Sequence, residues 1–249
     1  MITSARTTLA RILVLVAALA APGVAGATTS KPDQQTFLQT HRLDLLEADC
    51  SGSFRQTSET FVPEMVTIAE NSAQLQRALW AGCFDGAPLR DLIWNPTIDF
   101  GALPSTISNN PSLASRFNQA RALGLEPKLT HMIKTTPTRV PGSGQLEALE
   151  LAAQTSSVGR VFMFTDAEIN EVGGINLITA TPRQIEQTIE RWTPRLSGLR
   201  GVQLMFIGVG RDVHVTASVR NAEVLFEGLA KAVGASFSWD QNLPLGFQG

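Results

Sequence analysis

Near-continuous apolar segments alternate with segments of helical periodicity along this chain. The clearest apolar segment is Val161–Thr165, in which four apolar residues follow one another. Short uninterrupted apolar runs are typical of strands that are buried on both faces, as in a parallel sheet. Amphipathic helices between such strands cover the faces of the sheet. The pattern therefore predicts an α/β fold in which a parallel sheet is covered by helices on both faces.

Six strands and five helices are expected from this pattern. The strands are expected at residues 43–49, 78–84, 92–94, 161–165, 202–209 and 235–239. The helices are expected at residues 61–77, 112–123, 145–153, 182–196 and 222–233, with Thr181 as the N-cap and Pro182 as the first residue of the fourth helix. Parallel sheets bind ligands outside the carboxyl ends of their strands. Functional residues are therefore expected just after Ala48, Phe84, Thr165 and Val209.

The N-terminal segment has the three parts of a secretory signal peptide. Arg6 and Arg11 precede an uncharged apolar run at residues 12–20, and small residues up to Ala27 form a cleavage site. Pro22 interrupts the run, whereas a membrane span needs about 20 apolar residues. We expect residues 1–27 to be removed on export to the periplasm or the extracellular medium. No membrane span is expected in the mature chain.

The mature chain is expected to form one domain. We assign residues 28–41 to a polar leader, 42–240 to the domain and 241–249 to a C-terminal tail. Residues 101–141 form an insert that is longer than a compact α/β unit needs. Without Arg6 and Arg11, 18 basic residues stand against 22 acidic ones, a net charge of −4, and no basic cluster occurs. This balance disfavours nucleic acid or an anionic membrane as a partner.

A pattern with the chemistry of a cation site follows the first expected strand. Asp49, Ser51 and Ser53 alternate with Cys50 and Gly52. In an extended segment, residues at every second position point the same way, so the carboxylate and the two hydroxyls face one point. Oxygen ligands of this kind suit a hard cation such as Mg²⁺. The alternative is that the serines only cap a helix.

Two further segments supply oxygen atoms at the same expected edge. Asp166 follows the strand 161–165, and Ser143 precedes the helix 145–153. Each of these residues alone can be interpreted as a helix N-cap. Asp85 and Glu168 also lie near this edge, where they either tune the site or are ordinary turn residues. The joint occurrence of Asp49, Ser143 and Asp166 favours one shared site.

These segments resemble those of von Willebrand factor type A domains. Asp44–Ser53 resembles the first strand and metal motif of the family, and Gly142–Leu149 resembles the loop that supplies its threonine. Phe164-Thr165-Asp166 resembles the strand that ends in its second aspartate, and Phe206–Gly210 resembles its closing strand. The resemblance implies a doubly wound, mostly parallel six-stranded sheet in the order 3-2-1-4-5-6, with strand 3 antiparallel.

The resemblance also implies a metal-ion-dependent adhesion site. Its ligands here are Asp49, Ser51, Ser53, Ser143 and Asp166. The cation is Mg²⁺, with Mn²⁺ or Ca²⁺ as alternatives, and an acidic side chain of a protein or peptide partner completes its coordination. An incoming carboxylate gains a charge-assisted interaction with a cation that has few direct carboxylate ligands.

The two cysteines, Cys50 and Cys83, form either a disulfide or two buried free thiols. In the strand order of the family, the strands that carry them are neighbours. Neighbouring strands lie about 4.8 Å apart, within reach of a disulfide. The resemblance therefore implies a Cys50–Cys83 disulfide.

Two other functions remain open. Ser143 in place of threonine, Ala167 in place of glycine and Glu47 inside an apolar strand are consistent with a degenerate site in a metal-independent scaffold or assembly module. A hydrolase is disfavoured, because neither a Gly-x-Ser-x-Gly motif nor a catalytic signature around His41, His131 or His214 occurs. We therefore expect a binding protein rather than an enzyme.

Overall fold

The computed structural model describes residues 43–247, apart from residues 53, 93, 94, 143, 170, 212–214, 245 and 246. The expected signal peptide and polar leader lie outside the described residues, as do the two candidate ligands Ser53 and Ser143. No helix among the described residues is long and apolar enough to cross a membrane.

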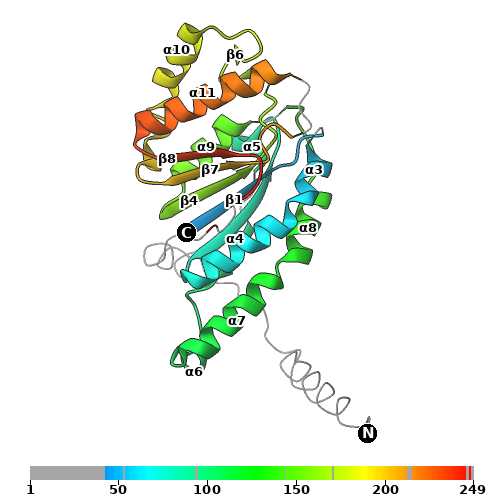
Figure 1. The fold of residues 1–249 in the computed structure, drawn as a ribbon, viewed down its shortest axis with the longest axis vertical. Coiled ribbons are helices and arrows are strands. Elements are labelled where there is room, and N and C mark those ends of the chain that lie inside the picture. The colour runs from blue at the N-terminus through cyan, green and yellow to red at the C-terminus, as the bar shows by residue number, and fades with distance from the viewer. Residues whose placement is uncertain are drawn as a thin grey trace. The chain divides into compact units, whose positions relative to one another are not determined.

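A six-stranded mixed sheet forms the centre of the described structure (Figure 1). The strand order is β3-β2-β1-β4-β7-β8, in which β3 is antiparallel to β2 and the other neighbouring pairs are parallel. The α/β class is thus confirmed, and numbering these six strands along the chain gives the expected order 3-2-1-4-5-6. The strands are β1 (Leu43–Asp49), β2 (Ala78–Phe84), β3 (Asn95–Asp99), β4 (Val158–Phe164), β7 (Gln203–Ile207) and β8 (Ser236–Asp240).

Helices lie on both sides of this sheet. Figure 1 shows α4 and α8 on one side and α11 on the other. The helices are α3 (Arg55–Thr60), α4 (Val62–Gln74), α5 (Pro88–Asp91), α6 (Ser105–Ser108), α7 (Pro111–Leu123), α8 (Glu126–Thr135), α9 (Gln145–Gln154), α10 (Pro182–Trp192) and α11 (Thr216–Val233), with a short 3₁₀ helix η1 (Ser197–Leu199).

The expected elements differ from the observed ones mainly at turns and ends. Strands β1 and β2 have the expected bounds. The third strand was expected at residues 92–94, of which only Leu92 is described and lies outside a strand, and β3 instead follows at Asn95–Asp99. The expected helix 61–77 corresponds to α4, with Pro63 in its first turn, where the missing N–H costs no hydrogen bond. Helix α3, which precedes it, was not expected. Helix α10 begins as expected, because Thr181 accepts from the backbone N–H of Gln184 and Gln184 accepts from that of Thr181.

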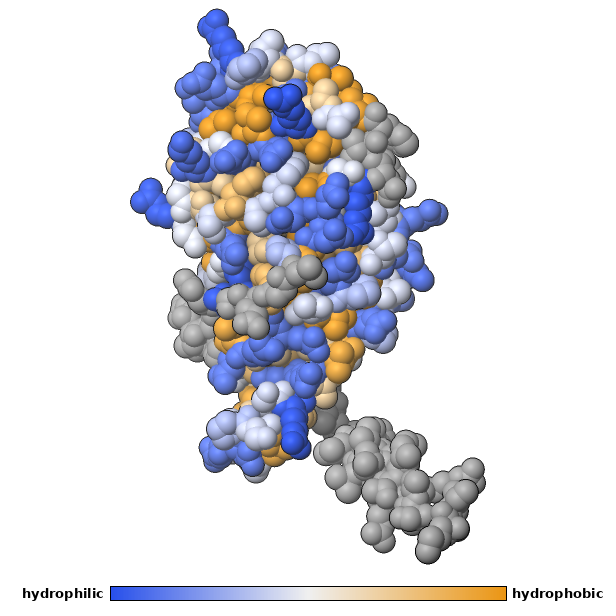
Figure 2. All heavy atoms as spheres, viewed as in Figure 1, coloured by the Kyte–Doolittle hydropathy of each residue, from blue (hydrophilic) through white to orange (hydrophobic). Residues whose placement is uncertain are grey.

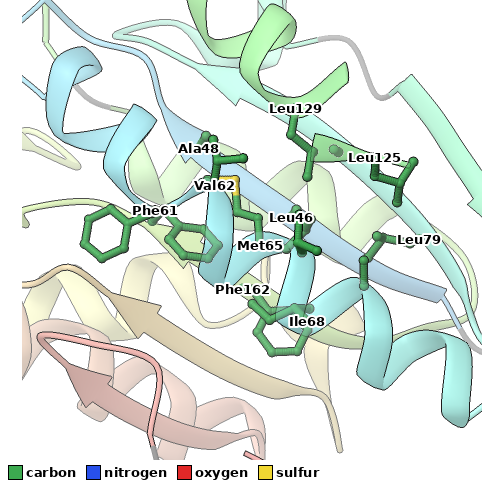
Figure 3. Close-up of a cluster of buried hydrophobic side chains, with 14 of the residues drawn as sticks. Leu46, Ala48, Phe61, Val62, Met65, Ile68, Leu79, Leu125, Leu129 and Phe162 are labelled. Atoms are coloured by element: carbon green, nitrogen blue, oxygen red, sulfur yellow. The ribbon is translucent and has the colours of Figure 1, made fainter. Parts of the chain in front are cut away.

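The face of the sheet under α4 and α8 holds an apolar cluster of buried side chains. Figure 3 shows Leu46 and Ala48 of β1 next to Met65 and Ile68 of α4, with Leu129 of α8 on the other side of β1 in this view. All five side chains are almost completely buried. Each buried aliphatic side chain contributes on the order of 2 kcal/mol through the removal of apolar area from water.

The opposite face packs against α9 and α11. Phe206 of β7 contacts Phe226 of α11 with ring centroids 4.8 Å apart, and also Trp239 of β8 at 5.2 Å. The tail after β8 returns to the α4 face, where Phe247 meets Phe162 edge-on at 5.6 Å. The tail therefore completes the cover of β4 on the side that α4 leaves open.

The insert at 101–141 contains three helices, α6, α7 and α8. It packs beside α4, since α7 and α8 both contact that helix, and α8 also contacts β2. A short antiparallel hairpin, β5 (Glu171–Val172) and β6 (Ile175–Asn176), follows β4 and was not expected from the sequence. Figure 2 shows a mostly hydrophilic face, with apolar residues gathered at its upper end over α10 and α11.

A buried ion-pair cluster lies at the amino end of β1 and β4. Arg160 donates to both carboxylate oxygens of Asp44, from Nε at 3.0 Å and from Nη2 at 2.5 Å. Ser72 and Arg77 also donate to Asp44, and Asn71 accepts from Arg160. Because every charge in the cluster is partnered, the buried carboxylate and guanidinium are accommodated in the core.

Candidate functional site

The carboxyl ends of β1, β2, β4 and β7 meet at one edge of the sheet. In the strand register, Asp49 pairs with Phe84, Ala48 with Phe164, and Phe164 with Ile207. The residues that follow these positions therefore lie together at this edge, including Asp85, Thr165 and Gly208. This is the edge at which the sequence predicts functional residues.

Asp49 is completely buried and belongs to a hydrogen-bond network. Its Oδ1 accepts from the backbone N–H of Ser51 at 3.0 Å, and its Oδ2 accepts from the hydroxyl of Thr165 at 3.0 Å. The Thr165 hydroxyl in turn accepts from Nε2 of Gln145 at 3.1 Å. Asp49 thereby links β1, the end of β4 and the first residue of α9.

Thr165 and Gln145 were not among the candidate ligands. Thr165 lies within the Phe164-Thr165-Asp166 motif, and its buried hydroxyl joins Asp49 to the loop after β4, which contains Asp166. Only its position at the end of a strand could have indicated this role from the sequence. Gln145 carried no such signal, because a glutamine at the start of a helix is usually exposed.

The buried side-chain hydroxyl of Ser51 is the clearest indication of a ligand at this edge. Its side chain is 3% exposed, and its Oγ has no hydrogen-bond partner. A buried hydroxyl without a partner costs about 1–3 kcal/mol. Ser51 also lines a cleft at the sheet edge. A ligand in this cleft would provide the interaction that the fold itself does not supply.

Asp166 lies nine-tenths buried beside this network. Its Oδ1 accepts from the backbone N–H of Glu168 at 2.9 Å. Burial, together with the negative charges of Asp49 and Glu168 and against the effect of that hydrogen bond, raises the pKa of Asp166 from 3.8 to about 6. A divalent cation between Asp49 and Asp166 would favour the ionised form of both.

The residue after Asp166 adopts a backbone conformation that favours glycine. Ala167 has a φ of +58°, in the left-handed region. This conformation costs a residue with a Cβ roughly 1 kcal/mol. The chain therefore makes the turn for which a glycine was expected, although it has alanine there. Ala167 is fully buried, and its backbone N–H donates to the Thr165 hydroxyl at 3.1 Å, which helps to hold the turn.

The cleft has a volume of about 760 Å³. Its walls come from the loops after β1 and β2, the end of the insert, the start of α9, and the hairpin after β4. The residues that line it are Ser51, Gly52, Gly86, Thr138, Pro141, Gly142, Gly144, Glu147, Glu168, Ile169, Val172, Gly173 and Gly174. A Cβ on Gly52 or Gly142 would meet no atom within 4 Å, so open space adjoins the backbone at these two positions.

Ser53 and Ser143 lie outside the described residues, so their part in the site stays a prediction. Gly52 precedes Ser53 in the sequence, and Gly142 and Gly144 flank Ser143. All three glycines line the cleft. The described glycines next to these two positions therefore border the same space as Ser51.

Asp85 has a structural role at this edge. Its side chain accepts from the backbone N–H groups of Ala87 at 3.0 Å, Arg139 at 2.8 Å and Val140 at 2.9 Å. These bonds fasten the end of the insert to the loop after β2. Of the two interpretations of Asp85 left open by the sequence, the turn residue fits this geometry.

Arg55 joins the insert to the loop that contains Ser51. Its guanidinium donates to the backbone carbonyls of Ile133 at 3.0 Å and Cys50 at 2.8 Å, and to the Thr138 hydroxyl at 2.7 Å. A further bond reaches the carbonyl of Thr136. The insert is therefore part of the frame of the cleft, which the sequence did not indicate.

A disulfide joins Cys50 and Cys83, with a Cα–Cα distance of 5.5 Å. This pairing confirms the expectation. Cys50 lies between Asp49 and Ser51, so the disulfide holds the first ligand loop against the end of β2.

The oxygen atoms at this edge are the kind of ligands that a hard cation such as Mg²⁺ accepts, and only a few of them are charged. No group of three or more His, Cys, Asp or Glu side chains within the described ranges is placed to hold a metal ion. The available set is instead two buried carboxylates and one unpartnered hydroxyl, from Asp49, Asp166 and Ser51. In proteins, Mg²⁺ is usually bound by one or two carboxylates, with neutral oxygens and water as its other ligands. The residues at the edge therefore fit the expected cation.

Comparison with known proteins adds no relative. No protein-family model matches the chain, and no curated protein matches it. The residues at the sheet edge are accordingly the basis for inferring a function.

Proposed function

We propose that this chain is an exported binding protein of the von Willebrand factor A type, with a doubly wound sheet, that holds a protein or peptide partner through a divalent cation. The cation would be Mg²⁺, or alternatively Mn²⁺ or Ca²⁺, held by Asp49, Ser51, Ser53, Ser143 and Asp166. The strand order and the meeting of the Asp49 and Asp166 segments at one edge support the proposal. The observation that carries it is the buried Ser51 Oγ, which has no hydrogen-bond partner, in a residue that lines the cleft.

The residues of this chain would orient the site, and the cation would supply an electrophilic centre for a partner carboxylate. Thr165 fixes the orientation of the Asp49 carboxylate by donating to its Oδ2. The backbone N–H of Glu168 does the same for Asp166. Pre-oriented ligands bind more tightly, because less conformational freedom is lost on binding. We propose no catalytic step.

Export is supported by the disulfide. Disulfides persist in oxidising compartments and are rare in the cytosol. The Cys50–Cys83 bond, together with the expected signal peptide at residues 1–27, fits a protein of the periplasm or the extracellular medium.

Replacing Ser51 by alanine is the sharpest test of the proposal. Because Ser51 Oγ has no hydrogen-bond partner, Ser51→Ala should leave the melting temperature in chelator unchanged or raised. In wild type, a cation at about 100 times its Kd adds about 2.7 kcal/mol. This corresponds to a rise in melting temperature of roughly 5–10 °C for a domain of this size. Ser51→Ala should lose most of that rise.

Ser58→Ala is the matched control. The buried Ser58 hydroxyl donates to the backbone carbonyl of Asp49 at 2.6 Å, so its loss should lower the melting temperature with and without metal. The increment produced by the cation should remain. If 10 mM Mg²⁺ or Mn²⁺ shifts neither wild type nor Ser51→Ala, the proposal is wrong.

A metal-independent scaffold is the second candidate. It is favoured by the two internal hydrogen bonds of Asp49, one to each carboxylate oxygen, since such bonds can be purely structural. In that case Asp49→Asn would change stability in the same way in chelator and in Mg²⁺, and calorimetric titration with the cation would show no heat of binding.

A further inference from the structure

Glycine is the most frequent residue in the described lining of the cleft. Six of the 13 described lining residues are Gly52, Gly86, Gly142, Gly144, Gly173 and Gly174. A wall without side chains lets another backbone approach closely. Most of these glycines, however, are required by the fold itself.

Packing or backbone conformation requires five of the six glycines. A Cβ on Gly86 or Gly144 would lie 2.2 or 2.3 Å from the nearest heavy atom, which is too close for any side chain. The remaining three, Gly142, Gly173 and Gly174, have φ values of +98°, +56° and +80°. This is the left-handed region, which favours glycine. These five positions therefore need no ligand to explain them.

Gly52 is the exception. Its φ lies outside the left-handed region, and a Cβ there would meet no atom within 4 Å. Neither packing nor backbone conformation therefore requires a glycine at this position. Alanine in place of such a glycine usually stabilises a protein, because the unfolded chain loses conformational freedom. The missing side chain instead leaves open space in the cleft, directly after Ser51.

Two observations indicate what occupies this space. Ser51 is 3% exposed and its Oγ has no hydrogen-bond partner, which independently points to a ligand. A Cβ on Gly142, in the loop before α9, would also meet no atom within 4 Å. Bare main chain from two separate segments thus borders the cleft. Its volume of about 760 Å³ lies within the usual range of ligand pockets.

The proposed cation also limits how far the partner's backbone can stay from this wall. An Asp or Glu side chain is only a few ångströms long, so the main chain that carries it must come close to the loop that holds the cation. A side chain at position 52 would stand in that space. The absence of one lets the partner's main chain approach.

We propose that the partner enters the cleft as an extended peptide segment, whose main chain passes over Gly52 beside the acidic residue that reaches the cation. This inference rests on the proposed cation site, which binds the acidic side chain. In an extended chain, successive side chains point to opposite faces, so the two neighbours of the acidic residue point away from Gly52. Gly52 is therefore a specificity-determining residue outside the metal ligand set.

A displayed library of random linear nine-residue peptides tests this path. The library is bound to the purified mature protein in Mg²⁺, and peptides released with a chelator are sequenced. Wild type should enrich linear peptides with an acidic residue over the background on Asp49→Ala. Synthetic copies should bind Gly52→Ala at least about fivefold more weakly than wild type, because the added methyl group overfills the path of the main chain. Calorimetry without peptide measures the Mg²⁺ affinity of the same variant, and the loss of peptide affinity should exceed the loss of Mg²⁺ affinity.

The matched control is Gly124→Ala, which adds the same methyl group at the end of α7, outside the cleft lining. Gly124 has a φ of −68°, and the nearest atoms to an added Cβ lie at 3.4 Å, an ordinary contact. This variant should bind the peptides as wild type does. The melting temperature of Gly52→Ala in chelator should equal or exceed that of wild type. A clear fall would show that the fold does need this glycine and would overturn the inference.

The other results separate this inference from the proposed function. Equal peptide affinity of Gly52→Ala and wild type would overturn the path over Gly52 and leave the cation site standing. A loss of peptide affinity no greater than the loss of Mg²⁺ affinity would do the same, because the methyl group would then act through the cation. So would a wild type that Mg²⁺ stabilises but that enriches no linear peptide. If Mg²⁺ does not raise the melting temperature of wild type, the cation site fails and this inference fails with it.

Discussion

Removal of the disulfide should cost this protein a large part of its stability. The proposed variant is Cys50→Ala/Cys83→Ala. The cysteines are 1% and 6% exposed, so alanine is preferable to serine, whose hydroxyl would be buried without a partner. The bond closes a segment with a sequence separation of 33 residues. The loop-entropy relation then gives about 3.7 kcal/mol at 25 °C.

This loss is large against the roughly 5–15 kcal/mol by which single domains are stable. Urea unfolding of the mature protein, followed by tryptophan fluorescence, measures it directly. The midpoint should fall, while the slope against urea should rise, because the unfolded chain without the cross-link exposes more surface. A loss below about 1 kcal/mol would refute the argument from chain entropy.

The same variant tests whether the disulfide matters for the site. Cys50 lies between Asp49 and Ser51, and its carbonyl accepts from Arg55 and Thr138. Those hydrogen bonds remain when the sulfur is removed. We therefore expect the folded variant to bind Mg²⁺ more weakly than wild type but still measurably, by calorimetry at a temperature where it is fully folded. Affinity equal to that of wild type would show that Arg55 and Thr138 alone hold the loop.

Three further predictions concern buried or bridging charges. Burial raises the pKa of Glu47 from 4.5 to about 8, and neither of its oxygens has a hydrogen-bond partner. The folded state therefore keeps a proton that the unfolded chain loses as the pH rises. The free energy of unfolding should fall by on the order of 4 kcal/mol between pH 4.5 and about 8. Urea titrations at several pH values should show a weaker pH dependence for Glu47→Gln. Arg160→Met should destabilise the protein by about 3–5 kcal/mol in the same assay, because it removes the main partner of the buried Asp44, whereas an effect below 1 kcal/mol would contradict the pairing. Arg55→Lys should lower the free energy of unfolding by about 2 kcal/mol and speed amide hydrogen exchange at residues 136–140, because a lysine cannot donate to all the acceptors of the guanidinium. Unchanged exchange there would show that other contacts hold the insert.

The elements that the sequence predicted best are those whose pattern is local. Strand β2 has no charged or polar side chain, β1 is rich in leucine, and the bounds of both were predicted correctly. The start of α10 was predicted from Thr181 and Pro182, because a capping box involves only neighbouring residues. The hairpin β5–β6 was missed, since each of its strands has only two residues and carries no periodicity.

The sequence predicted that the segments of Asp49 and Asp166 meet at one edge of the sheet, but it did not predict most of the hydrogen bonds there. Asp49 and Asp166 could be placed at one edge, because strand ends in a parallel sheet converge. Gln145 and Arg55 could not, since their roles depend on which loops the fold brings within hydrogen-bond distance. Gln145 reaches Thr165 across 20 positions, and Arg55 reaches Thr138 across 83.

The sequence by itself determined the α/β class, the edge of the sheet where chemistry belongs, and the residue types that suit a hard cation. Those properties follow from side-chain periodicity and from the short spacing within single segments. Only the tertiary structure decided that the Ser51 hydroxyl is left without a partner, that Asp85 fastens a loop, and that Glu147 and Glu168 line one cleft. Burial and hydrogen bonding between distant segments exist only once the chain has packed, so no local pattern encodes them.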